Sequence, residues 1–517
     1  MRNSNMETWF IFVMLFLCVS IIIKRILYLV FPRYPLPPGP PKVPIIGNFK
    51  LLQRFNKDPK TVLEKLHAKY GPIFSFQMGS HTDIFIANRF LAHQALIQNG
   101  STFADRPVAV PTKKIISSNQ NDILFSFYGP VWRALRRNLT SNILHPSQVK
   151  SYANARKWVL DMLLDRLKPE SGASNPIRVI DHFQYSMFCL LSFMCFGDKL
   201  DEKQIREIED SLRTMLLSFT KYNVLNFWPT ITRILFWKRW KEFLQLRRDL
   251  EALLIPYIDA RKKAKQERLS KDGKEDNINE FVLCYVDTLL NLRLVEEDEG
   301  SKLDYGNICT LCSEFLNAGT DTTSTALEWI MANLVKYPQI QERLVEEIRE
   351  VMVEGENEVK EEHLPKLPYL KSVILEGLRR HPPLHYVAPH RVTKDVVLDG
   401  YLVPTTASVN FFVAEIGRDP TAWDDPMAFK PERFMDNGGT TFDIMGSKEI
   451  NMMPFGAGRR MCPGYGLAIL HLEYFVANLV WNFEWKAMSG DDIDMSEKLL
   501  FTTVMKNPLK VHILPRK

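Results

Sequence analysis

The sequence predicts a mainly helical protein with a minor β-sheet region. Residues 150–300 follow an amphipathic helical pattern that is broken at Pro176 and Pro229. A further long helix opens at Glu314 and runs to about Lys336. Strand-like alternation of apolar and polar residues appears in short stretches closer to the N-terminus. No segment repeats with a period of about 20 to 50 residues, which argues against a solenoid.

Composition narrows the class of protein. The chain has 517 residues, of which 46% are hydrophobic, enough for one very large domain or for several ordinary ones. The formal charge of +6 is small and the basic residues are dispersed, so no nucleic-acid partner is indicated. The seven cysteines are scattered without a disulfide framework, which fits a reducing compartment. Cys309 and Cys312 form a C-x-x-C, which we interpret as two small residues on one helix face rather than a redox or zinc site.

The N-terminus is expected to anchor the protein in a membrane. Thr8–Ile23 is apolar, Lys24 and Arg25 follow, and Ile26–Phe31 extends the apolar run. A cleaved signal peptide is the main alternative, but no small-x-small cleavage site follows. The basic residues after the segment place the bulk of the chain in the cytosol. Residues 1–31 are therefore expected to form an uncleaved signal anchor.

Residues 32–48 are expected to form a proline-rich hinge. The segment from Pro35 to Pro41 reads Pro-Leu-Pro-Pro-Gly-Pro-Pro, which excludes a regular helix and favours a stiff, extended chain. A ligand for an SH3-type domain is the alternative, but a spacer that holds the globular part against the membrane fits better. The remaining residues, 49–517, would then form that globular part.

The first elements after the hinge are expected to be one helix and strands of a small sheet. A helix is predicted at Thr61–Tyr70. Alternation at Ile73–Met78, and the short apolar run Ile84–Ile86, predict strands.

The middle of the chain contains two ambiguous features. The charged stretch Arg261–Asn279 is most simply a solvated loop and helix end. An aromatic cluster is either part of the core or the lining of a substrate entrance that dips into lipid. Its members are Phe219, Tyr222, Phe227, Trp228, Phe236, Trp237 and Trp240.

The helix Glu314–Lys336 contains residues that are poor helix formers. Gly319 costs about 1 kcal/mol relative to alanine in a helix interior, and the hydroxyls that follow it compete with the backbone hydrogen bonds. Local rules broken in an otherwise consistent element indicate a functional site. Packing through small residues is the alternative explanation.

Residues 454–464 form a glycine-rich loop that presents Cys462 and leads into an apolar helix. Gly456, Gly458 and Gly464 lack a Cβ, so the backbone can turn tightly and approach a flat cofactor closely. Backbone N–H groups, two adjacent arginines and a following helix N-terminus would favour a thiolate. A thiolate held in this way can be the axial ligand of a haem iron. A lone cysteine is, however, more often a small buried hydrophobe.

The full pattern of this loop is that of a known family. The haem-binding signature of the cytochrome P450 superfamily, Phe-x-x-Gly-x-Arg-x-Cys-x-Gly, is met without departure by Phe455, Gly458, Arg460, Cys462 and Gly464. Further segments resemble other marks of that superfamily, in the expected order. These are Trp132-x-x-x-Arg136, Ala318-Gly319-x-Asp321-Thr322, Glu376-x-x-Arg379 and Pro431-Glu432-Arg433-Phe434.

The chain is therefore identified as a member of the cytochrome P450 superfamily, and it resembles plant microsomal members of the A-type clan. Within that clan it looks most similar to subfamily A of plant family eighty-nine. Residues 413–419, 431–434 and 454–460 carry this finer resemblance. The implied fold is the mainly helical haem-thiolate domain with a minor antiparallel sheet, covering residues 49–517.

The resemblance implies a role for each matching residue. Cys462 would be the axial ligand of haem iron, and Asp321 and Thr322 would manage proton delivery. Trp132, Arg136, Arg391 and Arg460 would hold the haem propionates, and Ala318 and Gly319 would make room over the iron. Phe455 and Gly464 would also belong to the cofactor-binding residues. Glu376, Arg379 and Arg433 would form a buried charge network beneath the cysteine loop. Substrate contacts are expected near residues 108–124, near Phe219, at Ala318, and from Leu384 to Val387 and at Phe501–Thr503.

The resemblance also implies the reaction and its surroundings. The expected activity is insertion of one atom of O₂ into a hydrophobic small molecule, by hydroxylation or epoxidation, with NADPH electrons delivered by a flavin reductase. The expected cofactor is haem b; the expected partners are NADPH-cytochrome P450 reductase, cytochrome b5 as a possible second donor, and membrane lipid. The expected location is the endoplasmic reticulum membrane, with the catalytic domain in the cytosol. Two alternatives stay open, namely a haem-thiolate isomerase or dehydratase that needs no O₂ and a non-enzymatic haem sensor.

Overall fold

The computed structural model describes most of the chain. The described residues are 14–16, 18–20, 34–41, 54, 58–78, 81–172, 176–226, 228–271, 282–294, 301–435, 442–488 and 492–516. The expected membrane anchor, residues 1–31, lies outside them except for two short pieces, and so does most of the hinge. Within the described part the protein is mainly helical with several small sheets, which confirms the predicted class.

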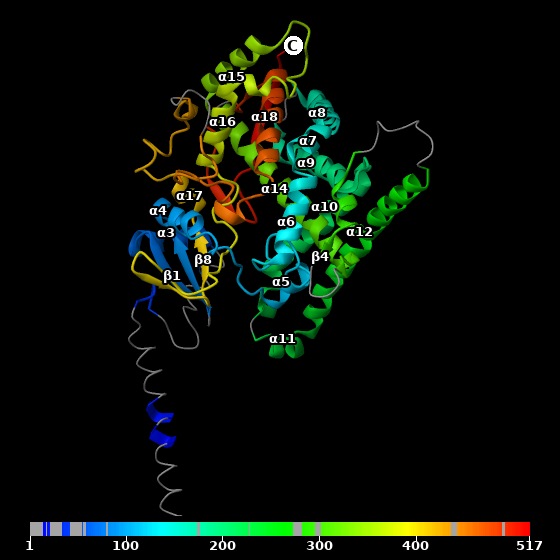
Figure 1. The fold of residues 1–517 in the computed structure, drawn as a ribbon. Coiled ribbons are helices and arrows are strands. Elements are labelled where there is room, and N and C mark those ends of the chain that lie inside the picture. Colours follow the sequence, from blue (N-terminus) through cyan, green and yellow to red (C-terminus); the bar gives the residue numbers. More distant parts are fainter. Residues whose placement is uncertain are drawn as a thin grey trace, which may run out of the picture.

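The helices and strands follow one another along the chain, and Figure 1 shows their arrangement. The helices are α3 (Pro59–Tyr70), α4 (Arg89–His93), α5 (Pro111–Ile116), α6 (Pro130–Asn142), α7 (Pro146–Ser151), α8 (Ala153–Leu167), α9 (Val179–Phe196), α10 (Glu202–Lys221), α11 (Pro229–Leu235), α12 (Trp237–Lys271), α13 (Tyr285–Leu289), α14 (Tyr305–Lys336), α15 (Pro338–Val351), α16 (Pro368–Arg380), α17 (Val413–Gly417) and α18 (Tyr465–Asn482). The strands are β1 (Ile73–Met78), β2 (His81–Ile86), β3 (Ile177–Arg178), β4 (Arg293–Leu294), β5 (Ser301–Lys302), β6 (Val396–Leu398), β7 (Tyr401–Val403), β8 (Ser408–Phe411), β9 (Phe483–Lys486), β10 (Glu497–Leu499), β11 (Thr503–Met505) and β12 (Lys510–Pro515).

Prolines begin several of these helices, because proline presets the helical φ and lacks an N–H that would be unsatisfied in the first turn. Pro59 begins α3 two residues before the predicted start, and the Asp58 side chain accepts a 3.1 Å hydrogen bond from the Thr61 N–H. Pro229 begins α11, at the predicted break. Pro338 follows α14, whose end at Lys336 was also predicted.

One local prediction is only partly confirmed. The stretch Arg261–Asn279 was expected to be a solvated loop and helix end; α12 ends within it at Lys271, and residues 272–279 lie outside the described residues. The helical part is, however, not fully solvated. Arg261 is buried, and its guanidinium lies 2.7 Å from a carboxylate oxygen of Asp287. A run of charges on one side of a long helix can thus contain a buried member when a carboxylate from another element pairs with it.

The sheets are small, and they are not all antiparallel as expected. Strands β1 and β2 pair antiparallel, but β2 also pairs in parallel with β8. The other pairs of named strands in the described residues are antiparallel. Parallel neighbours need a long crossover, and the chain between β2 and β8 supplies one by passing through the helical part of the molecule.

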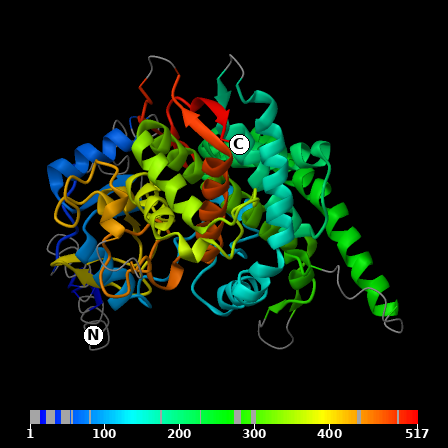
Figure 2. The same ribbon diagram turned by 90° about the horizontal axis from the view of Figure 1, so that it is seen from above.

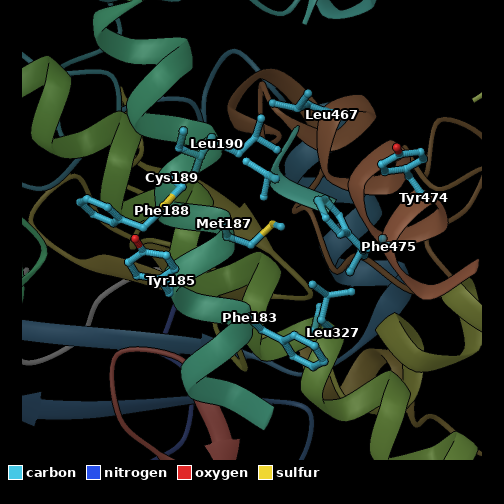
Figure 3. Packing of buried hydrophobic residues seen from close by; sticks show 14 of the residues in the cluster. Phe183, Tyr185, Met187, Phe188, Cys189, Leu190, Leu327, Leu467, Tyr474 and Phe475 are labelled. Carbon is cyan, nitrogen blue, oxygen red and sulfur yellow. The ribbon is translucent and has the colours of Figure 1, made fainter. Parts of the chain in front are cut away.

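The largest core lies where α9, α14 and α18 meet. Figure 3 shows side chains of these helices packed together, among them Met187 of α9, Leu327 of α14 and Phe475 of α18. Among the described residues, α9 alone is long and apolar enough to cross a membrane, and most of it is buried inside the protein. Seen from above, the part that contains β1 and β8 lies beside the helical part (Figure 2). α14 runs through the molecule between α9, α16 and α18.

The described hinge residues pack against the sheets. The Ser75 N–H and hydroxyl of β1 donate to the Pro38 and Pro37 carbonyls at 2.8 and 2.7 Å. The Leu402 N–H of β7 donates to the Pro35 carbonyl at 2.8 Å. A Cβ at Gly39 would lie 1.9 Å from the Ser75 carbonyl oxygen, so a side chain at Gly39 would prevent this close approach.

The aromatic cluster is divided between the core and the surface. Tyr222 and Trp240 are buried, whereas Trp228 and Trp237 are 73% and 57% exposed. Exposed apolar side chains of α11 lie beside the two exposed tryptophans, namely Ile231, Ile234 and Leu235. The side chain of Phe219 and all of Phe227 lie outside the described residues.

Candidate active site

The loop that carries Cys462 is a tight turn, and its backbone packs closely against the backbone of Leu96. Gly456 and Gly458 have φ of +70° and +69°, a region that disfavours residues with a Cβ. The Cys462 N–H donates to the Phe455 carbonyl at 2.8 Å, which closes the loop. A Cβ at Gly458 would lie 2.1 Å from the carbonyl oxygen of Leu96, so this position admits only glycine without a backbone shift.

The electrostatic environment of Cys462 differs from the expectation. Burial raises the pKa of the Cys462 thiol above its ordinary value. The Gly464 N–H and the Arg136 guanidinium lower it, as expected for a loop and a nearby cation, but burial outweighs them. The protein chain by itself therefore does not favour the thiolate, and metal coordination, which deprotonates a thiol outright, has to supply that.

Helix α6 brings two predicted residues to this loop. Trp132 is buried, and its indole N–H donates to the Ile123 carbonyl at 3.1 Å. Arg136 Nη2 donates to the Met461 carbonyl at 2.5 Å, directly beside Cys462. The guanidinium of Arg460 lies over the Trp132 ring, 4.3 Å from its centroid. The structure thus brings Trp132, Arg136 and Arg460 together beside Cys462.

The predicted arginines are already bonded to protein oxygen atoms. Arg460 donates to the carbonyls of Ala104 and Ser126 at 2.7 and 2.6 Å. Arg391 donates through Nε and Nη2 to one carboxylate oxygen of Asp105, the Nε bond being 3.1 Å long. Asp105 was missed by sequence reasoning, and the charged Asp105-Arg106 pair within an otherwise apolar segment could have indicated it.

Helix α14 is less buried at Ala318, Asp321 and Thr322 than along the turns that follow. Its residues 323–335 are buried, whereas Ala318 is exposed and Asp321 and Thr322 are half-buried. The Thr322 hydroxyl donates to the Ala318 carbonyl at 2.6 Å. Burial raises the pKa of Asp321, and the positive charge of Arg213 on α10 partly offsets this. A hydroxyl and a carboxyl whose pKa is raised thus lie on a half-buried turn of a central helix.

Gly319 does not lie on the exposed side of this turn. A Cβ at Gly319 would lie 2.6 Å from Cδ1 of Leu191 on α9. The role expected for it, to make room for a cofactor, thus has a competing explanation in the close packing of α14 against α9.

The structure brings together the three residues of the predicted charge network. Glu376 and Arg379 have fully buried side chains and form two hydrogen bonds of 2.7 and 2.8 Å. Arg433 lies 3.4 Å from the same carboxylate. Arg379 also donates to the carbonyls of Gly417 and Pro426, both at 2.9 Å. The network therefore ties α16 to the chain that precedes the cysteine loop.

Three of the residues expected to contact substrate, Leu384, Val387 and Phe501, lie on two segments near the cysteine loop and α14. Leu384 and Val387 are half-buried, and a Cβ at Gly456 would lie 3.5 Å from Val387 Cγ1, which places Val387 against the cysteine loop. Phe501 is 43% exposed on the turn between β10 and β11. The Thr502 hydroxyl lies 3.0 Å from the Thr325 hydroxyl, one turn beyond Asp321 on α14.

A further acidic residue faces this region. The Glu314 carboxylate, one turn before Ala318 on α14, accepts a 2.9 Å hydrogen bond from the Ile123 N–H. Burial, together with the nearby Asp122 carboxylate, raises the pKa of Glu314 to about 8. Glu314 was included in the predicted helix but not in the site, because a carboxylate at a helix start usually indicates only a favourable first turn.

These residues fit a haem. Cys462 offers a sulfur ligand, and an adjacent glycine, Gly464, leaves space beside it, because a Cβ there would lie 4.0 Å from Sγ. The exposed turn of α14 carries no bulky side chain at Ala318. The guanidinium groups of Arg136 and Arg460 would exchange a carbonyl partner for a propionate, which is the stronger acceptor.

Comparisons with known proteins agree with this arrangement. Residues 37–514 match the family model described as Cytochrome P450. The chain is 52% identical to Cytochrome P450 89A9 of Arabidopsis thaliana over 97% of each chain. It is 30% identical to germacrene A acid 8-beta-hydroxylase of Inula hupehensis over 94% of this chain and 93% of that protein. A zebra fish cytochrome P450 structure with progesterone has a TM-score of 0.72 at 23% sequence identity, covering 88% of this chain and 99% of that one, which shows the shared fold.

A match over nearly the whole chain, together with close plant relatives, confirms the predicted family and the enzyme class that it defines. The chain belongs to the cytochrome P450 family.

Proposed function

We propose that this protein is a haem-thiolate monooxygenase that inserts one oxygen atom of O₂ into a hydrophobic small molecule. The observation that carries the proposal is the placement of Cys462 beside Arg136 and Arg460, in a protein whose central helix carries an exposed Ala318 and a half-buried Asp321 and Thr322 on one turn. When bound to Cys462, haem b supplies the redox chemistry that activates O₂, with electrons from NADPH delivered by a flavin reductase.

The chain's own residues have distinct tasks in this proposal. Cys462 ligates the iron, while Arg136, Arg391, Arg460 and Trp132 orient the cofactor through its propionates. Asp321 takes up and releases protons, since its carboxyl lies on the same helix turn as the Thr322 hydroxyl and burial raises its pKa. Thr322 positions that proton through its hydroxyl.

The substrate is proposed to be a hydrophobic small molecule with few polar groups. The segments assigned to contact it are apolar around Leu384 and Val387 and carry hydroxyls near Thr502. Two relatives that are 30% and 31% identical to this chain are germacrene A acid 8-beta-hydroxylase of Inula hupehensis and 5-epiaristolochene 1,3-dihydroxylase of Nicotiana tabacum. We propose hydroxylation or epoxidation of a molecule of comparable hydrophobicity.

The protein is further proposed to reside at the endoplasmic reticulum membrane through residues 1–31, with residues 32–48 as hinge and the catalytic domain in the cytosol. The exposed apolar side chains of Trp228, Ile234 and Trp237 support a second contact with lipid. The cations Arg233, Lys238 and Arg239 lie on the same segment and suit an anionic lipid surface. We expect the protein to stay in the microsomal pellet after a high-salt wash. Release into the supernatant would contradict membrane anchoring by residues 1–31.

The function is tested with microsomes that contain the protein and a plant NADPH-cytochrome P450 reductase, incubated with a lipophilic plant extract. Mass spectrometry should find an ion that gains one oxygen atom only when NADPH is present. The Cys462→Ser variant should lose this product and also lose the red-shifted Soret band of the reduced, CO-treated protein, whereas Cys309→Ser should retain both. An equal product without NADPH would instead indicate an isomerase or dehydratase. A haem spectrum without any NADPH consumption would indicate a sensor.

The proton-delivery role of Thr322 is tested by Thr322→Ala. We expect this variant to bind CO normally, to lower product formed per NADPH by roughly tenfold, and to release more hydrogen peroxide, because protons then arrive by an uncontrolled route. Thr322→Ser keeps the hydroxyl and should behave like the unaltered protein. An unchanged ratio of product to peroxide in Thr322→Ala would remove Thr322 from proton delivery.

A further inference from the structure

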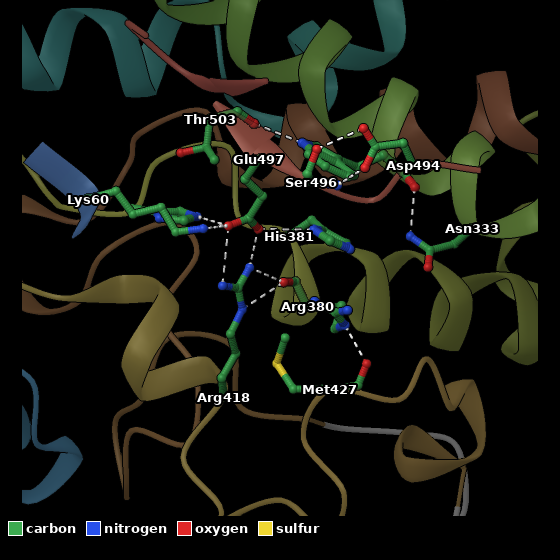
Figure 4. Close-up of polar contacts among 12 residues, drawn as sticks. Lys60, Asn333, Arg380, His381, Arg418, Met427, Asp494, Ser496, Glu497 and Thr503 are labelled. Atoms are coloured by element: carbon green, nitrogen blue, oxygen red, sulfur yellow. Dashed lines mark hydrogen bonds and ion pairs between the residues drawn. The ribbon is translucent and has the colours of Figure 1, made fainter. Parts of the chain in front are cut away.

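Glu497 is a buried carboxylate that gathers side chains from separate parts of the fold (Figure 4). It begins β10, and only 5% of its side chain is exposed. Lys60 Nζ of α3 lies 2.8 Å from one carboxylate oxygen, and Arg418 Nη2 donates to the other. His381 Nδ1 and His385 Nε2 lie 3.2 and 3.5 Å from the carboxylate. These five residues are called the Glu497 hub below.

The charge on Glu497 is stabilised by its neighbours in the hub. Burial opposes this charge, but the hydrogen bond from His381, the nearby His385 ring and the charge of Arg418 hold the pKa of Glu497 well below the ordinary range. Burial lowers the pKa of His381 to about 3, so this ring is neutral at neutral pH. The cations Lys60 and Arg418 therefore depend on Glu497 as their shared counter-ion.

Arg418 of the hub, and β11, the strand that pairs with β10, also bond to the chain around the end of α16. Arg418 Nη2 donates to the Arg380 carbonyl at 2.6 Å, at the end of α16. The Thr503 N–H of β11 donates to the Pro383 carbonyl at 2.7 Å. The β10–β11 hairpin is thus attached to residues 380–385 from both of its strands.

The same hairpin contacts α14. The His381 ring stacks on the indole of Trp329, with a centroid separation of 4.0 Å and an interplanar angle of 1°. The Trp329 N–H donates to the Thr503 carbonyl at 2.8 Å. Together with the 3.0 Å contact between the Thr502 and Thr325 hydroxyls, this places the turn at Phe501 beside the helix that carries Asp321.

We propose that Glu497 is a positioning residue that sets the shape of the substrate cavity by holding the Phe501 turn against α14 and residues 384–387. Glu497 does not contact the substrate; it acts through the turn. The inference rests on the proposed function, because it takes the space between α14 and the Cys462 loop as the haem and substrate site. Neither the haem-binding signature nor the Glu376 network includes any residue of the hub.

The test uses two nitrogen ligands of haem iron that differ in size, titrated into the full-length protein by absorbance. Imidazole needs space only above the iron, whereas a triarylmethyl imidazole fills the cavity. We expect Glu497→Gln to weaken binding of the bulky ligand by roughly tenfold and to change imidazole binding by less than about twofold. Equal changes for the two ligands, or no change for either, would overturn the proposal.

Matched variants separate this role from a general loss of stability. Glu342→Gln removes a carboxylate that pairs with Arg516 at 2.8 Å, an ion pair that shares no residue with the hub, and should leave both affinities unchanged. In a Phe501→Ala background, Glu497→Gln should add no further selective loss, because the group through which it acts is gone; additive effects would contradict the mechanism. If Glu497→Gln does not fold, Lys60→Met at the edge of the hub should still weaken only the bulky ligand.

The same titration distinguishes failure of this inference from failure of the proposed function. Unaltered protein that shows the haem-thiolate CO spectrum and binds imidazole supports the haem assignment whatever Glu497→Gln does. Unaltered protein with neither property would overturn the haem assignment and, with it, this inference.

Discussion

Replacement of Glu376 by glutamine is expected to prevent the accumulation of folded, haem-containing protein. Glutamine keeps the shape of the side chain but removes the one carboxylate that, among the described residues, is bonded to the guanidinium of Arg379, and both side chains are fully buried. Stranding one partner of a buried ion pair costs about 3–5 kcal/mol, a large part of the roughly 5–15 kcal/mol that stabilises a typical protein. The measurements are the yield of protein with the haem-thiolate CO spectrum and the urea midpoint of whatever is recovered.

The matched control for Glu376 is Glu432, which lies in the same part of the chain as Arg433. The Glu432 carboxylate is 50% exposed and pairs with Arg343 at 2.6 Å. An exposed pair contributes only about 0–1 kcal/mol, so Glu432→Gln should be recovered in near-normal yield. Equal recovery of the two variants would show that the Glu376 network does not support the cysteine loop.

Replacement of Gly458 by alanine is the second change expected to have a large effect. An alanine in the left-handed conformation at φ +69° costs about 1–2 kcal/mol, and overpacking typically adds about 1–3 kcal/mol. The neighbour that a Cβ would meet, at 2.1 Å, is the backbone carbonyl of Leu96, which cannot rotate away. We expect a loss of about 2–5 kcal/mol in the free energy of unfolding, measured by urea denaturation, together with reduced haem content.

The control position for Gly458 is Gly466, eight residues later in the chain. A Cβ at Gly466 would meet no atom within 4 Å, and this residue is the second of α18. Alanine is favoured over glycine in helices by about 1 kcal/mol, so Gly466→Ala should match or exceed the stability of the unaltered protein. A Gly458→Ala variant as stable as Gly466→Ala would mean that the loop can move away from Leu96.

Much of the helical architecture could be predicted because its signals are local. Proline at the start of α11 and just after the end of α14 marks helix boundaries through its own covalent geometry. Arg261 shows the limit of such reasoning. Its neighbours are charged, so the local pattern indicates solvent, but Asp287 from another element buries and pairs with it. The parallel pairing of β2 with β8 was missed for the same reason, since strand direction depends on the path of the intervening chain.

The contacts of the candidate site also divide into those that local spacing predicts and those that depend on the path of the folded chain. Glu376 and Arg379 share a helix, so their contact follows from a spacing of three residues. The contact of Arg433 with Glu376, by contrast, depends on how the chain after α16 folds back. Hub members at positions 60, 381, 385, 418 and 497 have no sequence relation, and therefore no pattern in the chain indicates the hub.

The sequence by itself determined the family, the cysteine that is proposed to bind iron and the helix that is proposed to deliver protons, because these depend on short segments whose chemistry is readable residue by residue. Only the tertiary structure decided the direction in which burial shifts the pKa of Cys462, the packing role of Gly319 and the charge hub around Glu497. Each of these depends on burial or on partners that are distant in the chain. Desolvation and long-range contacts are properties of the folded packing, and they do not appear in any local run of residues.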